Sequence, residues 1–153
     1  MLLKPYLMRK GFVCFFFLVF VAVSGMAQVK LTWKDFADID FESVYNEKYE
    51  VYFLKPKFGQ KIKTYQGKKI SITGFFLDLS GSGEIFLVSQ NPMASCFFCG
   101  AAGPETIIEV SFKEKQSFRT DQIVSITGVL ELNADDVDHC NYILNLASGR
   151  LVN

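Results

Sequence analysis

The sequence is poor in histidine and lacks the common motifs of enzyme active sites. Its 153 residues include one histidine, His139, and one tryptophan. It contains no G-x-S-x-G motif of a serine nucleophile, and no glycine-rich phosphate-binding loop stands before a predicted helix. A hydrolase would have to use His139 as its sole imidazole base. Since no convincing catalytic constellation is present, we expect a protein that is not an enzyme.

An excess of positive charge is also absent. The chain has 16 Lys and Arg against 16 Asp and Glu, and three of the basic residues lie in the first ten positions. Without residues 1–27, 126 residues remain with 13 basic and 16 acidic side chains, a formal charge of −3. Nucleic-acid binding rests on basic residues that neutralise phosphates. The composition therefore predicts no nucleic-acid partner, and the length suits one domain with its own core.

The longest apolar run stands at the N-terminus. Three basic residues precede an apolar stretch over 11–23, and small residues follow up to Ala27. This is the layout of a cleaved secretory signal peptide, with an uncleaved anchor as the alternative. The run is shorter than the ~20 residues of an ordinary membrane span. We therefore expect a signal peptide over 1–27, cleavage after about Ala27, a periplasmic or secreted protein, and no membrane span after cleavage.

Five stretches of alternating, β-branched sequence predict strands. They lie at 68–79, 84–90, 106–112, 121–133 and 141–153, the last with a break at Ser148-Gly149. Turn residues separate them, among them the SGSG that would join the first two strands into a hairpin. Five short strands in this arrangement indicate an all-β barrel or sandwich.

Two of these strands share a motif. ISITG at 70–74 and VSITG at 124–128 have four identical residues. A glycine inside a strand marks a bulge or bend, and bends at matching positions let a small sheet close. We therefore predict a small five-stranded OB-like barrel over 65–153, with any helix in 113–120 reduced to a turn. OB-folds bind many ligand classes, so the fold does not choose among them.

Residues 28–64 are predicted to form an N-terminal helix and strand extension that packs on the barrel. Thr32 is a suitable N-cap for a short helix or turn over 33–39. Alternating residues around 49–54 predict a strand that stops at Pro56.

Three cysteines remain after signal cleavage, an odd number. Cys96 and Cys99 form a C-x-x-C motif followed by Gly100, and Cys140 directly follows His139. C-x-x-C followed by glycine is typical of zinc knuckles, where glycine permits the tight turn. Loops after the second and fourth strands of an antiparallel barrel lie at the same end, so the two groups can meet. The pattern predicts a candidate site for zinc or another thiophilic metal at Cys96, Cys99, Cys140 and His139.

Two other uses of the cysteines stay open. C-x-x-C pairs can exchange disulfides, so a periplasmic thiol–disulfide oxidoreductase is one alternative, although this motif lies in a predicted loop rather than at a helix start. A disulfide from Cys140 to Cys96 or Cys99 is the other, which would give a disulfide-stapled interaction domain without chemistry. The aspartates between 135 and 138 could supply a carboxylate ligand, but they are typical of a solvated turn.

Three segments together carry a resemblance: YQGKKISITGFFLDL (65–79), EIFLVS (84–89) and SCFFCGAAGPETIIEV (95–110). They resemble a family of uncharacterised secreted or periplasmic bacterial proteins, a domain of unknown function, in its Bacteroidetes-type version with C-x-x-C-G in the loop. The chain departs from the wider family pattern in having no histidine in that loop. The resemblance implies an exported protein and transfers no catalytic residue. We therefore expect an exported binding or structural module with an unknown small ligand or protein partner.

Overall fold

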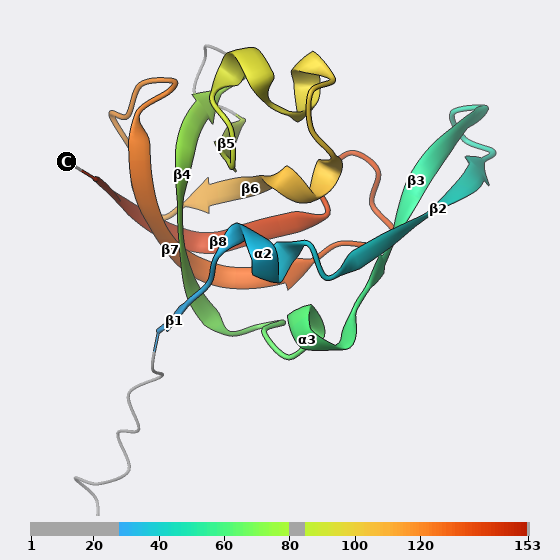
Figure 1. The fold of residues 1–153 in the computed structure, drawn as a ribbon, viewed down its shortest axis with the longest axis horizontal. Helices are drawn as coiled ribbons and strands as arrows, with labels where there is room; N and C mark the ends of the chain where they lie inside the picture. The colour runs from blue at the N-terminus through green and yellow to red at the C-terminus, as the bar shows by residue number, and fades with distance from the viewer. Residues whose placement is uncertain (1–27, 80–84, 153) are drawn as a thin grey trace, which may run out of the picture.

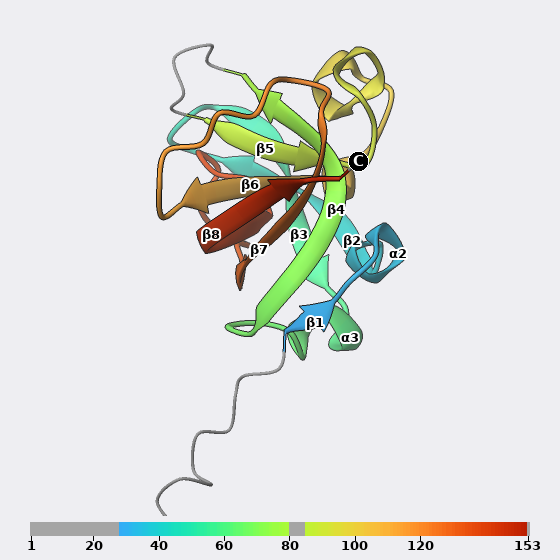
Figure 2. The same ribbon diagram turned by 90° about the vertical axis from the view of Figure 1, so that its left-hand side faces the viewer.

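The computed structural model describes residues 28–79 and 85–152, so the predicted signal peptide and the SGSG turn lie outside the described residues. Within them the protein is mostly β-strand, with two short α-helices, α2 (Trp33–Phe36) and α3 (Gln60–Lys63). Figures 1 and 2 show a strongly curved barrel from which a two-stranded hairpin reaches out. No helix in this part of the chain is long and apolar enough to cross a membrane.

Five strands form the closed barrel. They are β4 (Lys69–Asp78), β5 (Phe86–Ser89), β6 (Ile107–Phe112), β7 (Ile123–Leu132) and β8 (Tyr142–Leu151). Their order is β4-β5-β6-β8-β7, and β7 pairs back onto β4. Neighbouring strands are antiparallel except for β6 and β8, which are parallel. This closed Greek-key order confirms the predicted small OB-like barrel.

The repeated motif forms the seam between β4 and β7. Ile72 lies opposite Ile126, and the pairing continues outward until Ile70 faces Gly128 and Gly74 faces the first residue of VSITG. The two copies therefore pair with each other about a local two-fold axis. The predicted match between the first and fourth barrel strands is thus a direct contact.

The two glycines of the motif differ: Gly74 lies at a close approach between strands, and a register shift, as predicted, is found at Gly128. A Cβ at Gly74 would lie 2.4 Å from the carbonyl oxygen of Ser89, so the approach of β5 to β4 requires glycine there. At Gly128 the register of β7 against β8 shifts, and Leu146 on β8 has a positive φ of 51°. β8 itself continues through Ser148-Gly149, which corrects the predicted break.

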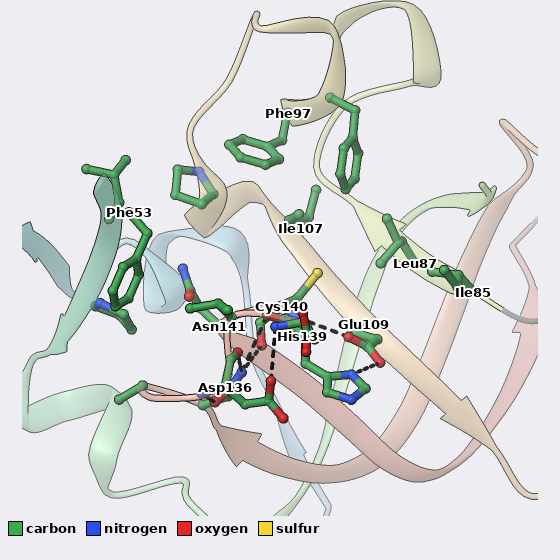
Figure 3. A pocket seen from close by; sticks show the side chains of 18 of the residues that line it. Phe53, Ile85, Leu87, Phe97, Ile107, Glu109, Asp136, His139, Cys140 and Asn141 are labelled. Atoms are coloured by element: carbon green, nitrogen blue, oxygen red, sulfur yellow. Dashed lines mark hydrogen bonds and ion pairs between the residues drawn. The ribbon is translucent and has the colours of Figure 1, made fainter. Parts of the chain in front are cut away.

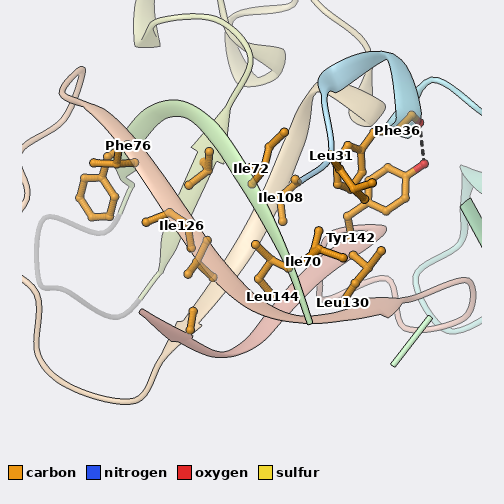
Figure 4. Packing of buried hydrophobic residues seen from close by; sticks show 14 of the residues in the cluster. Leu31, Phe36, Ile70, Ile72, Phe76, Ile108, Ile126, Leu130, Tyr142 and Leu144 are labelled. Carbon is orange, nitrogen blue, oxygen red and sulfur yellow. Dashed lines mark hydrogen bonds between the residues drawn. The ribbon is translucent and has the colours of Figure 1, made fainter. Parts of the chain in front are cut away.

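Aliphatic side chains from alternate strand positions fill the barrel (Figure 4). Ile70, Ile72, Ile108, Ile126 and Leu144 are buried there. The segment 113–120 between β6 and β7 contains no helix, as its length led us to expect.

The N-terminal extension contributes to this same core. β1 (Val29–Lys30) pairs in parallel with β4. Phe36 at the end of α2 is fully buried, with its ring centroid 4.9 Å from that of Tyr142. The Tyr142 hydroxyl donates a 2.7 Å hydrogen bond to the Phe36 carbonyl, so both its apolar body and its polar end are satisfied.

The short helix α2 begins at the predicted cap. The backbone N–H and the hydroxyl of Thr32 both donate to the Asp35 carboxylate at 2.8 Å, and the Asp35 N–H donates back to the Thr32 carbonyl. Backbone groups at the helix start are thereby satisfied locally.

A hairpin of β2 (Ile39–Asn46) and β3 (Val51–Phe58) forms a separate two-stranded sheet. Two features differ from the prediction. β2 was not expected, and β3 does not stop at Pro56 but runs through it, with Pro56 opposite Phe41. A two-stranded sheet leaves an open edge on each strand, and proline is tolerated on such edges because no ladder hydrogen bond is lost there.

Candidate functional site

The loop with the C-x-x-C motif folds over the outside of the barrel. It contains three 3₁₀ turns, η1 (Met93–Ser95), η2 (Phe97–Cys99) and η3 (Pro104–Thr106). Gly100 ends η2 at a φ of +73°, the left-handed conformation that glycine adopts without strain. The Met93 N–H donates to the Asp121 carboxylate at 2.7 Å, which ties the loop to the start of β7.

The three cysteines of the predicted mature chain have different surroundings. Cys96 is fully buried in a small second cluster with Leu77 and Leu87, against which Cys140 packs. Cys99 is exposed, and its thiol donates to the Met93 carbonyl at 3.0 Å. All three are free thiols in the structure.

None of the resolved shifts activates a thiol. Burial, with a smaller effect of the Glu109 charge, raises the pKa of Cys140 to about 12. Desolvation and the neighbouring Cys96 raise the pKa of Cys99. A thiol that attacks disulfides needs a lowered pKa, so neither group has the character of a redox nucleophile.

Glu109 on β6 holds the loop between β7 and β8 in place. One carboxylate oxygen lies 2.8 Å from Nδ1 of His139, and the other accepts the Cys140 N–H at 3.0 Å. The carboxylate raises the pKa of His139 because it stabilises the imidazolium. Glu109 therefore fixes both the position of the loop and the orientation of the only imidazole in the chain.

Asn133 organises the same loop from within. Its side-chain oxygen accepts the N–H groups of Asp135 and Asp136, and its amide group donates to the carbonyls of Asp136 and Cys140. Such local bonds are what make Asn a strong turn former. The loop is thus a defined turn rather than a loose connection.

A pocket of about 460 Å³ lies where these loops meet the hairpin. Its walls come from β3, from the outer faces of β5 and β6, from the C-x-x-C loop and from the loop over 133–141. Figure 3 shows Phe97 and Ile107 on one side of the pocket, and Asp136, His139 and Glu109 on the other. The pocket therefore has a mostly apolar wall and a polar one.

The structure brings the predicted cysteine loops together but does not assemble the predicted zinc set. Cys96 and Cys140 lie in one cluster, so the two loops meet as expected. The Cys99 thiol, however, bonds the Met93 carbonyl, and His139 bonds Glu109. In the described part of the chain no group of three or more His, Cys, Asp or Glu side chains is placed to hold a metal ion.

A zinc site at Cys96, Cys99, Cys140 and His139 therefore stays a prediction. Native mass spectrometry with and without a chelator tests it, since a bound metal adds its mass to the intact protein.

Sequence reasoning missed two parts of the site. Glu109 looked like an ordinary surface residue of a strand. The available signal was its position two residues after Ile107, which places both side chains on the same, outer face of the strand. The hairpin wall, with Phe53 and Leu54, was missed because β2 was not expected; the alternation of Ile39, Phe41 and Tyr45 was the available signal.

Comparison with known protein families, with curated proteins and with solved structures finds no match to this chain. The family resemblance carried by residues 65–110 therefore stays a prediction.

Proposed function

We propose that this protein is an exported binding module that holds a small, largely apolar ligand in the pocket between the hairpin and the barrel. The pocket of about 460 Å³ is the observation that carries the proposal, since small-molecule sites are concave, mostly apolar and equipped with a few polar groups.

The position of the pocket supports binding. β5 and β6 are the second and third barrel strands, and residues 133–141 connect the fourth and fifth. OB-folds use this strand face and this loop for ligands. The interior of the barrel is filled by its core, so a ligand has access to the outer face only.

A binding role without catalysis agrees with the chemistry of the lining. His139 is tied to Glu109, and the Cys140 thiol is held neutral by its raised pKa. The thiol–disulfide oxidoreductase alternative is disfavoured because Cys96 is fully buried, whereas reactive thiols are partly exposed, and because the pKa of Cys99 is raised. Export remains part of the proposal because it rests on the predicted signal peptide.

Titration with the neutral fluorescent probe N-phenyl-1-naphthylamine tests the proposal. We expect saturable binding to the purified mature chain, with fluorescence rising as the probe leaves water. Leu54→Ser and Phe98→Ser remove exposed apolar side chains that line the pocket. Each substitution is expected to weaken binding by about fivefold to tenfold, because apolar contact area is lost.

Leu151→Ser is the matched control, because Leu151 is 45% exposed, close to the 54% of Leu54, and lies outside the lining. Equal weakening by Leu151→Ser and Leu54→Ser would show that the probe reports general surface apolarity, and the proposal would fail. Absence of saturable binding would overturn it as well.

A further inference from the structure

We propose that the ligand of this pocket carries a positively charged organic group, such as an ammonium, attached to its apolar body. The inference rests on the proposed function and names the chemical class of the ligand. It is carried by the charges of the lining, the geometry of the loop over 133–141 and the aromatic wall opposite.

The lining is charged with one sign. Glu109, Asp136 and Asp138 contribute carboxylates, and no lysine or arginine is among the described residues of the lining. His139 is the one lining residue that can become cationic, and it is paired with Glu109. Once protonated, His139 neutralises Glu109, so the remaining negative charge of the lining belongs to Asp136 and Asp138.

The hydrogen bonds that both aspartates accept come from neutral donors. One oxygen of Asp136 accepts the Asp138 N–H at 3.0 Å. The carboxylate of Asp138 accepts the Tyr49 hydroxyl at 3.1 Å. Lys48 does not line the pocket; it donates to that hydroxyl at 2.6 Å, and its charge compensates part of the charge of Asp136 and Asp138.

Asp135 in the same loop shows the contrast. It forms an ion pair with Lys55 at 2.8 Å and does not line the pocket. The loop thus turns one aspartate toward a lysine of the hairpin and two toward the pocket. Asp136 and Asp138 line the pocket, and neither forms a salt bridge within the described residues, whereas Asp135 does.

Aromatic rings complete the environment for a cation. Phe53, Phe97 and Phe98 belong to the lining, and the rings of Phe97 and Phe98 meet edge to face at a centroid distance of 5.3 Å. The faces of aromatic rings attract ammonium groups, and they also hold apolar chains. The head group of an anionic ligand would meet two carboxylates and would not be attracted by the ring faces, so the lining discriminates against it.

Three amphiphiles with the same ten-carbon chain test the inference. They are decyltrimethylammonium, decyl maltoside and decanoate, each used below its micelle concentration, and binding is read from displacement of N-phenyl-1-naphthylamine. We expect decyltrimethylammonium to bind at least about tenfold more tightly than decanoate, with decyl maltoside between them. Added NaCl should weaken the binding of decyltrimethylammonium and leave the affinity for decyl maltoside unchanged, because salt screens exposed charges.

Asp136→Asn and Asp138→Asn remove the two charges while keeping an acceptor oxygen for each loop hydrogen bond. Each substitution is expected to weaken the affinity for decyltrimethylammonium by about twofold to fivefold and to leave the affinity for decyl maltoside unchanged. Asp135→Asn is the matched control, since it removes the same charge from the same loop outside the lining, and it should leave the preference unchanged. Circular dichroism and thermal melts verify that all three variants are folded.

The outcomes separate the two proposals. If decyl maltoside binds and the affinity for decanoate equals that for decyltrimethylammonium, this inference is overturned while the binding function stands. The inference is also overturned if Asp135→Asn reduces the preference as much as Asp136→Asn does, because the effect would then be that of net charge. If N-phenyl-1-naphthylamine itself does not bind saturably, the proposed function fails, and this inference with it; if it binds but decyltrimethylammonium does not displace it, only this inference is overturned.

Discussion

Gly74 and Gly128 occupy matching places in ISITG and VSITG, yet their surroundings differ. A Cβ at Gly74 would lie 2.4 Å from the Ser89 carbonyl oxygen and 2.8 Å from the Trp33 ring, whereas at Gly128 the nearest atom, the Asn145 carbonyl oxygen, would be 3.0 Å away. We expect Gly74→Ala to lower the free energy of unfolding by about 2–3 kcal/mol and Gly128→Ala by about 1 kcal/mol or less. Urea unfolding monitored by Trp33 fluorescence measures both, and equal losses would contradict the difference in packing.

His139 can be titrated without ambiguity because it is the only histidine in the chain. The Glu109 carboxylate at 2.8 Å raises the pKa of His139, so in a protein freed of any histidine tag the single imidazole signal in the NMR spectrum should titrate above its usual pH. Glu109→Gln should bring the titration back toward the ordinary value. A wild-type pKa at or below that of Glu109→Gln would contradict the pairing.

The same pair makes a small contribution to stability that depends on pH. Because the folded pKa of His139 is raised, the contribution is fully present below the unfolded pKa of the imidazole and is lost as the pH rises through the folded pKa. The His139 side chain is 51% exposed, so solvent limits the contribution to less than about 1 kcal/mol. Unfolding of His139→Gln should lack this pH-dependent component.

At the scale of elements, the hairpin depends on its own cross-strand contacts. Tyr45 and Tyr52 face each other across β2 and β3, with ring centroids 5.2 Å apart. Such a pair contributes about 0.2–1 kcal/mol to a hairpin. Tyr45→Ala should therefore speed amide hydrogen exchange in residues 39–58 and weaken probe binding while leaving exchange in the barrel strands unchanged. Val51→Ala, at an exposed position of the same hairpin, is the control. Faster exchange throughout the barrel would contradict this independence.

The barrel strands could be predicted from sequence because one face of each packs inward, which gives alternation a clear signal. β7, with Val124, Ile126 and Leu130 all fully buried, is the strongest case. The signal is weaker in the hairpin, where alternation around 49–54 predicted part of β3 while β2 was missed. β2 and β3 form no part of the barrel sheet, and Tyr52 is 72% exposed, so burial imposes little pattern on them. Pro56 added a stop signal that applies to central strands and not to a strand with an open edge.

Strand direction allowed only one part of the site to be predicted, namely which loops lie at the same end of the barrel. Antiparallel order places the loops after the second and fourth barrel strands at one end, and Cys96 and Cys140 do meet there. Which atoms bond within the loops depends on side-chain rotamers and local turns, and sequence spacing does not encode these. The partnership of Glu109 with His139 joins positions 30 residues apart and is of this kind.

At the scale of the whole molecule, the N-terminal extension belongs to the folding unit. Leu31, Phe36 and Ile62 are buried in the same cluster as the barrel interior. Phe36→Ala should cost about 3–5 kcal/mol, a large part of the stability of an ordinary domain. We therefore expect a fragment of residues 65–153 to lack a cooperative thermal transition, unlike residues 28–153. A sharp transition in the shorter fragment would contradict this view.

Because ISITG and VSITG are nearly identical, the chain must distinguish two strands that could exchange places. The seam cannot do this, since its two-fold pairing looks alike from either side. The N-terminal segment supplies the asymmetry: β1 pairs with Ile70 and Ser71, and the Trp33 indole N–H donates to the Thr73 carbonyl at 2.9 Å. These contacts are made to one copy of the motif only, while the other pairs with β8, so we expect the first residues after the predicted cleavage site to favour the observed placement of the two strands.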